Sequence, residues 1–250
     1  MPFVHNLDPV LFYLWNFQIR YYGLAWAFGF LVTYYFIIKS KDKLNVSREE
    51  LENYMVYLIL SIVIGARLFH VLFSDPGYYF ANPFKIFALW EGGVAFHGGL
   101  TGAILSTFYF VRKNNVSWKK LGDILVVPAA LFLAIGRIAN FINGELYGTV
   151  TDVSWCVNFK DILGCRHPSQ LYESLANFLI FGVLLFFRKT EKKEGVLLFV
   201  FVLLMGVTRF LISFLREDPK WLGLSDGQYF SLIMILAGGY FLYKNKRITA

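Results

Sequence analysis

The sequence predicts an all-α integral membrane protein: a bundle of seven transmembrane helices, with the N-terminus outside the cell and the C-terminus in the cytoplasm. Of its 250 residues, 57% are hydrophobic and 16% are charged, a balance outside the range of soluble globular domains. Its apolar runs are about 20 residues long, the length that a helix needs to cross a hydrocarbon core of about 30 Å. Runs of this length also exclude a β-barrel, whose strands have about 10 residues of alternating character.

Seven such runs follow one another along the chain, and the first and last carry no charge. The segment before Arg20 has neither a cationic start nor a small-residue cleavage site, so we do not expect a removable signal peptide. The predicted spans are Tyr21 to Ile38, Tyr54 to Phe73, Val94 to Val111, Ile124 to Asn143, Gln170 to Phe187, Gly195 to Leu215 and Gly227 to Tyr243.

The orientation follows from the cationic residues between the spans. Of the 24 Lys and Arg residues, 15 fall in alternate connections, at 39–50, 112–120, 188–194 and 244–247. If every run crosses the membrane, these connections share one side, and the excess of positive charge predicts that this side is cytoplasmic. This topology accounts for the net charge of +7, and the dispersed basic residues give no reason to expect a nucleic-acid partner.

The whole chain, 1–250, is expected to form one membrane domain with two longer segments outside it. The aromatic segment 74–93 is predicted to lie at the membrane interface, and 149–169 is predicted to be an outside loop. This loop holds both cysteines, Cys156 and Cys165. An oxidising exterior would permit a disulfide between them, but two free thiols are equally compatible with the sequence.

Polar residues recur at one depth of the predicted bundle. An arginine lies about 20 Å from the inner boundary in each of three outward-running spans, and a polar residue lies near the outer start of three inward-running spans. These positions predict a shared polar cavity open to the outer leaflet, with unrelated snorkelling side chains as the alternative. The residues are Arg67, Arg137, Arg209, Tyr22, His97 and Glu173.

Arginine is well suited to bind an anion in such a cavity. Its planar guanidinium binds phosphate through two donors and stays charged when desolvated, so converging arginines point to an anionic substrate, most simply a phospholipid. The competing interpretation is an internal network of salt bridges, for which the nearby carboxylates are Glu91, Glu145 and Glu173.

The stretch "FHGGLTG" combines a histidine with glycines. His97 is a candidate general base, because histidine titrates near neutral pH, although a histidine within a membrane is more commonly a hydrogen-bonded core residue. Glycines such as Gly98 and Gly99 allow a neighbouring backbone or a lipid to approach closely. The other histidines have no metal-ligand spacing, so neither a metal nor another cofactor is expected.

The stretch "GRIANFINGELYG" places several polar groups at the end of an apolar run. Arg137, Asn140 and Gly144 share one helix face, while Gly144 and Gly148 are expected to end the helix and let Glu145 turn back toward the cavity. A second face carries Met205, Arg209, Ser213 and Arg216.

These motifs, together with "RHPSQLYE", "RYYGLAW" and "SDGQYFS", resemble those of the bacterial prolipoprotein diacylglyceryl transferases over essentially the whole chain. The resemblance implies a multi-pass protein of the cytoplasmic (inner) membrane with its active site facing the outer leaflet. It implies transfer of the diacylglyceryl group of phosphatidylglycerol to the lipobox cysteine of exported lipoprotein precursors, which forms a thioether and releases glycerol phosphate.

The resemblance also implies roles for individual residues. The catalytic set is His97, Arg137, Arg209, Tyr22, Asn140 and Glu145, and the phosphatidylglycerol contacts are Arg137, Arg209, Gly98, Gly99, Gly148 and Arg67. The chain departs from the family pattern at Ala139, where glycine is usual, at Met205, where tyrosine is expected, and at Ser213, where glutamate is expected. These departures weaken any detailed assignment on the sixth span.

A lipid-binding or transport protein that uses the same cationic cavity is the main alternative to an enzyme. Against it, the sequence has neither broken-helix inverted repeats nor an acidic residue near the middle of the membrane. A retinal protein is excluded because the last span has no lysine before Lys244 for a Schiff base.

Overall fold

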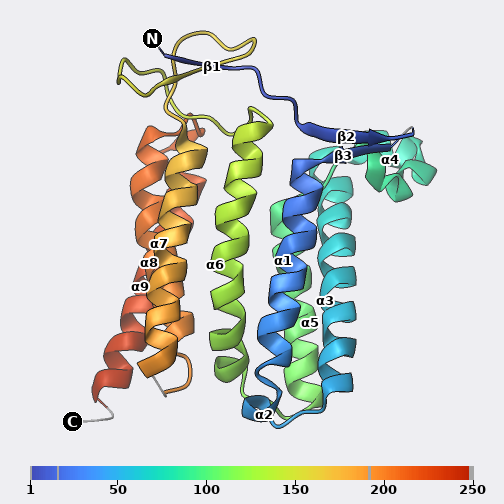
Figure 1. Ribbon diagram of the computed structural model, residues 1–250, viewed down its shortest axis with the longest axis vertical. Helices are drawn as coiled ribbons and strands as arrows, with labels where there is room; N and C mark the ends of the chain where they lie inside the picture. Colours follow the sequence, from blue (N-terminus) through green and yellow to red (C-terminus); the bar gives the residue numbers. More distant parts are fainter. Residues whose placement is uncertain (1, 16, 191–192, 248–250) are drawn as a thin grey trace. The chain divides into compact units, whose positions relative to one another are not determined.

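The computed structural model describes residues 2–15, 17–190 and 193–247, and these residues are mainly helical (Figure 1). Seven long helices occupy the predicted apolar runs. They are α1 (Tyr21–Ile38), α3 (Arg48–Phe69), α5 (Phe96–Lys113), α6 (Trp118–Ile142), α7 (Ser169–Thr190), α8 (Val196–Ile212) and α9 (Asp226–Arg247).

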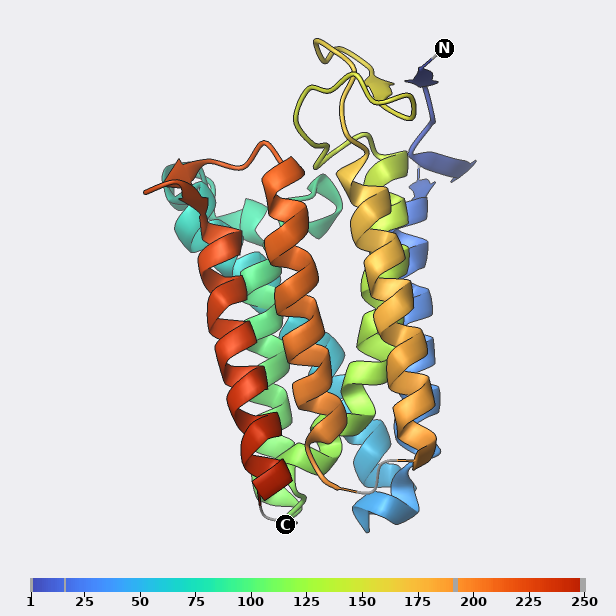
Figure 2. The ribbon, with the colours of Figure 1, turned by 90° about the vertical axis from the view of Figure 1, so that its left-hand side faces the viewer.

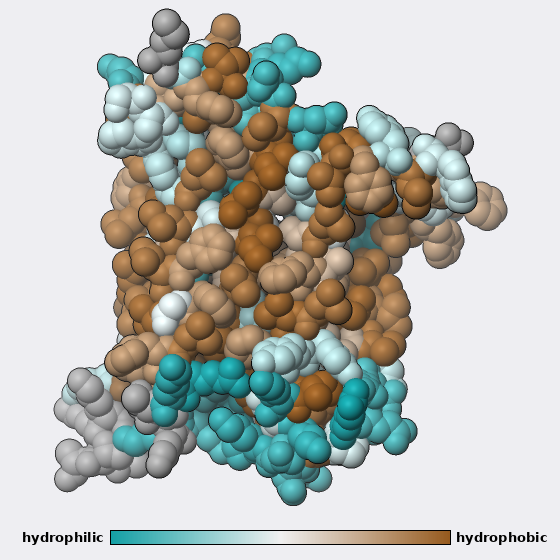
Figure 3. Space-filling view, viewed as in Figure 1, coloured by the Kyte–Doolittle hydropathy of each residue, from teal (hydrophilic) through white to brown (hydrophobic). Residues whose placement is uncertain are grey.

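Among the described residues, five helices are long and apolar enough to cross a membrane: α1, α3 with its continuation to Ser74, α6, α7 to Lys189, and α8 with its continuation to Leu215. The helices α5 and α9 are not among them, and both carry charged residues at their C-terminal ends. The structure therefore confirms a mainly helical protein with several helices long and apolar enough to span a membrane, while the count of seven crossings stays a prediction. Figure 3 shows apolar side chains over the middle of the helices and hydrophilic ones near their lower ends.

The chain divides into two compact units. Unit 1 comprises 1–33 and 122–250, and unit 2 comprises 34–121. In unit 1, α8 packs against both α7 and α9 (Figure 2), and the ring of Trp26 on α1 contacts Phe132 on α6 at 4.9 Å between centroids. In unit 2, α3 packs along α5, and the short helix α2 (Lys41–Leu44) precedes α3.

The start of α3 has a strong local signal in the sequence. Ser47 accepts a hydrogen bond from the backbone amide of Glu50, and the Glu50 carboxylate accepts one from the backbone amide of Ser47. This reciprocal capping box satisfies two amides that the first helical turn would otherwise leave without partners.

Glycine fixes the contact between α3 and α5. A Cβ at Gly98 would lie 2.2 Å from the carbonyl oxygen of Gly65, and one at Gly102 would lie 2.0 Å from that of Ser61. The two backbones therefore pass at a distance that a larger residue would not permit. The sequence left open whether a backbone or a lipid faces these glycines, and at Gly98 the structure places a backbone there.

Within the described part of the chain, six short strands form three pairs that the all-α prediction did not include. β1 (Phe3–His5) pairs in parallel with β4 (Val157–Phe159), β2 (Val10–Leu14) forms a hairpin with β3 (Phe17–Arg20), and β5 (Lys220–Trp221) pairs with β6 (Leu224–Ser225). They lie outside the helices, where hydropathy carries little information about local structure. The loop after α6 also contains a disulfide between Cys156 and Cys165, whose Cα atoms are 5.5 Å apart, so the free-thiol alternative does not apply.

The segment 74–93 in unit 2 follows the π-helical turn η1 (His70–Ser74). It consists of α4 (Pro76–Ala81) and the 3₁₀ turns η2 (Pro83–Phe87) and η3 (Leu89–Glu91). Its aromatic side chains are largely exposed, including Phe80, Phe84, Phe87 and Trp90. Exposed aromatic side chains of this kind suit the interfacial position that the sequence predicts.

Candidate functional site

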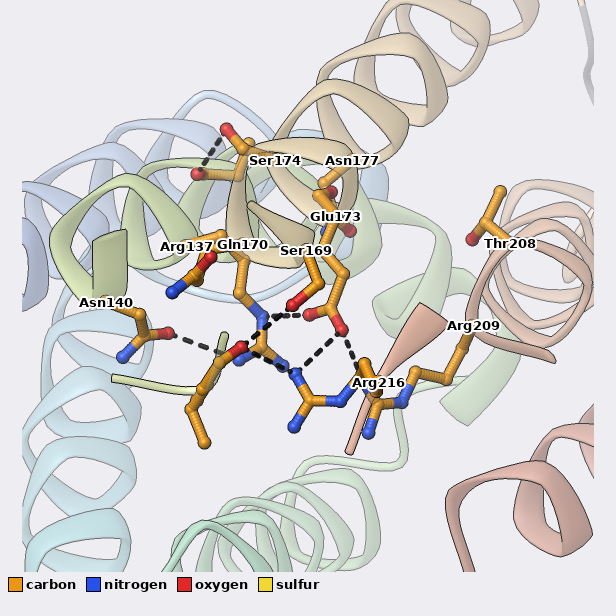
Figure 4. A network of polar contacts seen from close by, with 12 residues as sticks. Arg137, Asn140, Ser169, Gln170, Glu173, Ser174, Asn177, Thr208, Arg209 and Arg216 are labelled. Carbon is orange, nitrogen blue, oxygen red and sulfur yellow. Dashed lines mark hydrogen bonds and ion pairs between the residues drawn. The ribbon is translucent and has the colours of Figure 1, made fainter. Parts of the chain in front are cut away.

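A cluster of arginines surrounds one buried carboxylate in unit 1, at the C-terminal ends of α6 and α8 and the N-terminal end of α7. Glu173 on α7 is 5% exposed and accepts from three arginines (Figure 4). Nε of Arg137 lies 2.5 Å from its Oε2, Arg209 bonds to its Oε1, and Nη1 of Arg216 lies 3.4 Å from the same Oε1. We name Glu173 and these three arginines the Glu173 cluster.

A second carboxylate extends the cluster beyond the end of α8. Asp218 lies 2.9 Å from Nε of Arg216 and 3.5 Å from Nη2 of Arg209. Burial raises the pKa of Asp218, but the hydrogen bonds and charge of Arg216, followed by the charge of Arg209, outweigh burial and leave the pKa below its ordinary value. Three guanidinium groups and two carboxylates give the cluster an excess of one positive charge.

The arginines differ in their access to the surroundings. The side chains of Arg137 and Arg209 are each 27% exposed, whereas that of Arg216 is 7% exposed. Arg137 and Arg209 therefore have surface left to meet a ligand, while Arg216 is enclosed by Glu173, Asp218 and the carbonyl of Leu146.

The end of α6 positions Arg137 much as the sequence predicts. Nη1 of Arg137 donates to Oδ1 of Asn140 over 3.2 Å, and Nδ2 of Asn140 donates to Glu145 over 2.7 Å. Gly144 has a φ of +68°, which an L side chain rarely adopts, and this turn brings Glu145 back onto the helix end. Asn140 thus links Arg137 to Glu145.

Gly148 does not end α6, as the sequence suggested, because the helix already ends at Ile142, while its contact with phosphatidylglycerol stays a prediction. It lies beyond the helix end and forms a β-bridge with Arg216, and its amide donates to the carbonyl of His167 over 2.8 Å. A Cβ at this position would lie 2.4 Å from the carbonyl oxygen of Leu215. Glycine is required there because two backbone segments cross, which lets the loop after α6 reach the segment after α8.

The loop that contains the disulfide is fastened to the same segment. Arg166, next to Cys165, donates to the carbonyl of Gly148, forms an ion pair with Glu217 and lies over the ring of Tyr147. The sequence analysis gave no role to Arg166, Glu217 or Asp218. The sequence gives little indication of such a role, because charged residues are common in loops and only the fold brings these three close together.

The remaining predicted residue of unit 1, Tyr22, is half-buried near the start of α1. It lies close enough to Arg137 for an electrostatic interaction between the two side chains. Unit 1 therefore gathers five predicted catalytic residues into one neighbourhood: Tyr22, Arg137, Asn140, Glu145 and Arg209.

A small cavity of about 40 Å³ borders the cluster between α6, α7 and α8. Arg137, Glu173 and Arg209 contribute to its wall, as does Met205, one of the departures from the family pattern. Its volume suits a few water molecules rather than a phospholipid headgroup. Ser213, another departure, is fully buried and its hydroxyl has no hydrogen-bond partner among the described residues.

The other predicted site residues belong to unit 2. His97 is exposed in the first turn of α5, where its ring packs against those of Phe69 and Phe96. Gly98 and Gly99 are buried against α3, and the nearest atom to a Cβ at Gly99 would be a side-chain atom of Ile62 at 3.5 Å. The side chain of Glu91, one of the carboxylates considered in the sequence, lies outside the described residues.

Arg67 has an environment unlike that of the other arginines. It is 4% exposed, and its guanidinium donates to five backbone carbonyls, those of Lys85, Ile86, Ala88, Gly92 and Gly93. The group also lies over the ring of Tyr79, 5.0 Å from its centroid. Every donor position of the fork is thus directed at the polypeptide.

Comparisons with known proteins identify the family of this chain. The family model described as prolipoprotein diacylglyceryl transferase matches residues 9–244. A relative from Geobacter sulfurreducens is 39% identical over 247 residues, covering 95% of each chain, and one from Bordetella parapertussis is 40% identical over 251 residues, also covering 95% of each. One from Idiomarina loihiensis is 38% identical, covering 96% of this chain and 94% of the relative.

All three relatives carry the name phosphatidylglycerol–prolipoprotein diacylglyceryl transferase. The match spans the helices that carry the Glu173 cluster and those that carry His97 and Arg67. The chain belongs to the prolipoprotein diacylglyceryl transferase family.

Proposed function

We propose that this protein transfers the diacylglyceryl group of phosphatidylglycerol to the thiol of the lipobox cysteine in exported lipoprotein precursors, the first step of their maturation. The observation that carries the proposal beyond family membership is the Glu173 cluster, in which two partly exposed guanidinium groups converge on one carboxylate. A lipid phosphate is an oxyanion that the same donors can bind.

In the reaction, the cysteine sulfur attacks the glycerol carbon next to the phosphate. A carbon–sulfur bond forms, the bond from that carbon to the phosphate oxygen breaks, and the phosphate leaves as glycerol phosphate while the thiol releases its proton. Negative charge grows on the departing phosphate. We assign to Arg137 and Arg209 the stabilisation of this charge, which their partly exposed guanidinium groups support, and fixed donors at such a site typically contribute several kcal/mol.

The thiol needs help to react, because a free cysteine with a pKa near 8.5 is mostly protonated at neutral pH. We assign His97 as the general base, and Tyr22, Asn140 and Glu145 as groups that orient the arginines. The alternative is that His97 binds the lipid headgroup and the arginines alone favour the thiolate. If His97→Gln retains near-normal turnover at pH 7, the role as base is wrong.

The proposed location is the cytoplasmic membrane, with all seven long helices crossing it, the N-terminus outside and the reaction at the outer leaflet. The 15 cationic residues in alternate connections support this orientation. Phosphatidylglycerol and the precursor peptide are the proposed partners, and no nucleic acid, metal or other cofactor takes part.

Mass spectrometry tests the proposal directly. Purified protein in detergent is incubated with phosphatidylglycerol and a lipobox peptide that has one cysteine, beside Arg137→Ala and beside a peptide with serine in place of that cysteine. We expect a diacylglyceryl mass gain on the cysteine peptide with the natural protein, and none in either control. Arg137-dependent binding of phosphatidylglycerol without any adduct would instead support a lipid-binding or transport protein.

A further inference from the structure

We propose that Arg67 is a positioning residue for His97, holding the chain that leads into α5, and that it does not bind the lipid. This inference rests on the proposed role of His97 as the base. The sequence alone placed Arg67 among the phosphatidylglycerol contacts, because it matches Arg137 and Arg209 in depth along an outward-running helix.

The contacts of Arg67 are those of a structural hub. Its Nη1 donates to the carbonyls of Gly92 and Gly93, the latter over 2.9 Å, and these residues lie five and four positions before His97, respectively. Its Nε and Nη2 bind the carbonyls of residues 85, 86 and 88 over 2.5 to 3.2 Å. With five carbonyls around it and 4% of its surface exposed, the guanidinium has no accessible face for a phosphate.

The short stretch that joins Gly93 to His97 is held by backbone contacts before and after His97. The amide of Ala95 donates to the carbonyl of Ala66 over 3.0 Å, next to Arg67 itself. One residue after His97, Gly98 meets the backbone of Gly65. His97 therefore sits between two backbone contacts with the last turns of α3, and Arg67 holds the segment that enters the first of them.

Gly93 also depends on Arg67. Its φ of +76° directs the chain toward α5, and a Cβ there would lie 2.7 Å from Nη1 of Arg67. Lysine carries the same charge but has one nitrogen and no planar fork, so it cannot reach five carbonyls at once. Arg67→Lys therefore keeps the positive charge at this position and removes the planar set of donors.

The test compares transfer rates for the natural protein, Arg67→Lys, His97→Gln and the double variant, with Arg20→Lys as a surface control. We expect Arg67→Lys to lower kcat roughly 10- to 100-fold, because displacing a reacting group by about 1 Å has effects of that size, with the KM for phosphatidylglycerol within threefold. In the double variant the rate should equal that of His97→Gln, since the base through which Arg67 acts is already gone.

Two results would overturn the inference. One is a rise in KM with kcat unchanged, which is the signature of a lost lipid contact. The other is a double variant slower than His97→Gln by the full factor seen for Arg67→Lys alone. A near-normal rate for the single variant His97→Gln would instead refute the role of His97 as the base in the proposed function. This outcome can be told apart from the two results above, because it needs no change at Arg67.

Discussion

Arg67 and Arg137 are the same residue type at matching positions on two helices that the sequence predicts to run outward, yet their surroundings differ completely. Arg67 donates to five backbone carbonyls and is 4% exposed, whereas Arg137 pairs with a carboxylate and an amide and its side chain is 27% exposed. We infer that the guanidinium whose donors all meet carbonyls fixes the fold, and that the one that shares a carboxylate with other arginines has a face left for an anion. Depth in the membrane does not distinguish these roles, but the partners do.

The largest expected effect concerns the second exposed arginine of the Glu173 cluster. Arg209→Lys keeps the charge but loses the planar fork, and we expect transfer to fall roughly 100- to 1,000-fold, the size seen when one donor to a developing oxyanion is removed. Rates measured by mass spectrometry on the lipobox peptide check this. Arg20→Lys, at an exposed arginine bonded to Gln18, serves as the matched control. Equal rates for the two variants would refute the phosphate role of Arg209.

Glu173→Gln tests whether the arginines of the Glu173 cluster can bind an anion, because it leaves them without the carboxylate that they share. We expect the free energy of unfolding to fall by roughly 2–3 kcal/mol, below the full value for a buried pair since two of the arginines are partly exposed. Added phosphatidylglycerol should raise the unfolding temperature of this variant more than that of the natural protein, because the lipid phosphate replaces the missing carboxylate.

Thermal unfolding in detergent, followed by tryptophan fluorescence with and without the lipid, measures both effects. A zwitterionic phospholipid added at the same concentration is the control. A smaller lipid-dependent shift in Glu173→Gln than in the natural protein would contradict the idea that phosphate and carboxylate use the same donors.

Neighbouring glycines on α5 give a matched pair with a smaller effect. Gly98→Ala should destabilise the protein by about 1–3 kcal/mol, because the new methyl group would collide with the backbone of Gly65. Gly99→Ala should be tolerated, since its methyl group would meet the side chains of Ile62 and Ala66 and the carbonyl oxygen of Ile62 only at ordinary van der Waals distances. The same unfolding assay compares them. If both variants are stable and both raise the KM for phosphatidylglycerol, the glycines face the lipid after all.

The smallest effect concerns the opposite end of the helix that carries Arg209. Asp123 on α6 accepts from the backbone amides of Gly195 and Leu198 over 2.6 and 2.8 Å, and so caps the start of α8. Asp123→Ala should cost about 1 kcal/mol of stability, as the loss of a helix cap does. Asp123→Asn keeps one acceptor, so its free energy of unfolding should lie between those of the natural protein and Asp123→Ala. An unchanged free energy of unfolding in Asp123→Ala would show that the cap contributes nothing.

Much of the fold could be predicted from the sequence, because the hydrocarbon core of a membrane permits few kinds of backbone structure. A hydrocarbon core demands long apolar helices, and each of the seven predicted runs lies mostly in a helix, with α1 having the predicted bounds. The strands could not be predicted in the same way. β1 and β4 are more than 150 residues apart in sequence, and their pairing depends on a loop that the disulfide closes.

The candidate site was predictable where its residues lie on one helix. Arg137 and Asn140 are three residues apart on α6, and helical spacing alone brings them together. The centre of the cluster was not predictable in this way. Glu173 lies on α7, whereas Arg216 and Asp218 lie in the segment that follows α8. The sequence placed Glu173 in the predicted polar cavity and among three possible salt-bridge partners, but it did not indicate that Glu173 pairs with three arginines at once. The salt-bridge interpretation, given second place in the sequence analysis, describes how these arginines are held.

The most direct test of the contrast between the two arginines is native mass spectrometry of bound lipid. The natural protein, Arg67→Lys and Arg137→Lys are purified in the same mild detergent with added phosphatidylglycerol, and the protein-bound lipid is counted. Our account predicts that Arg67→Lys retains phosphatidylglycerol as the natural protein does and that Arg137→Lys loses most of it. Loss of the lipid from Arg67→Lys together with its retention by Arg137→Lys would contradict the account.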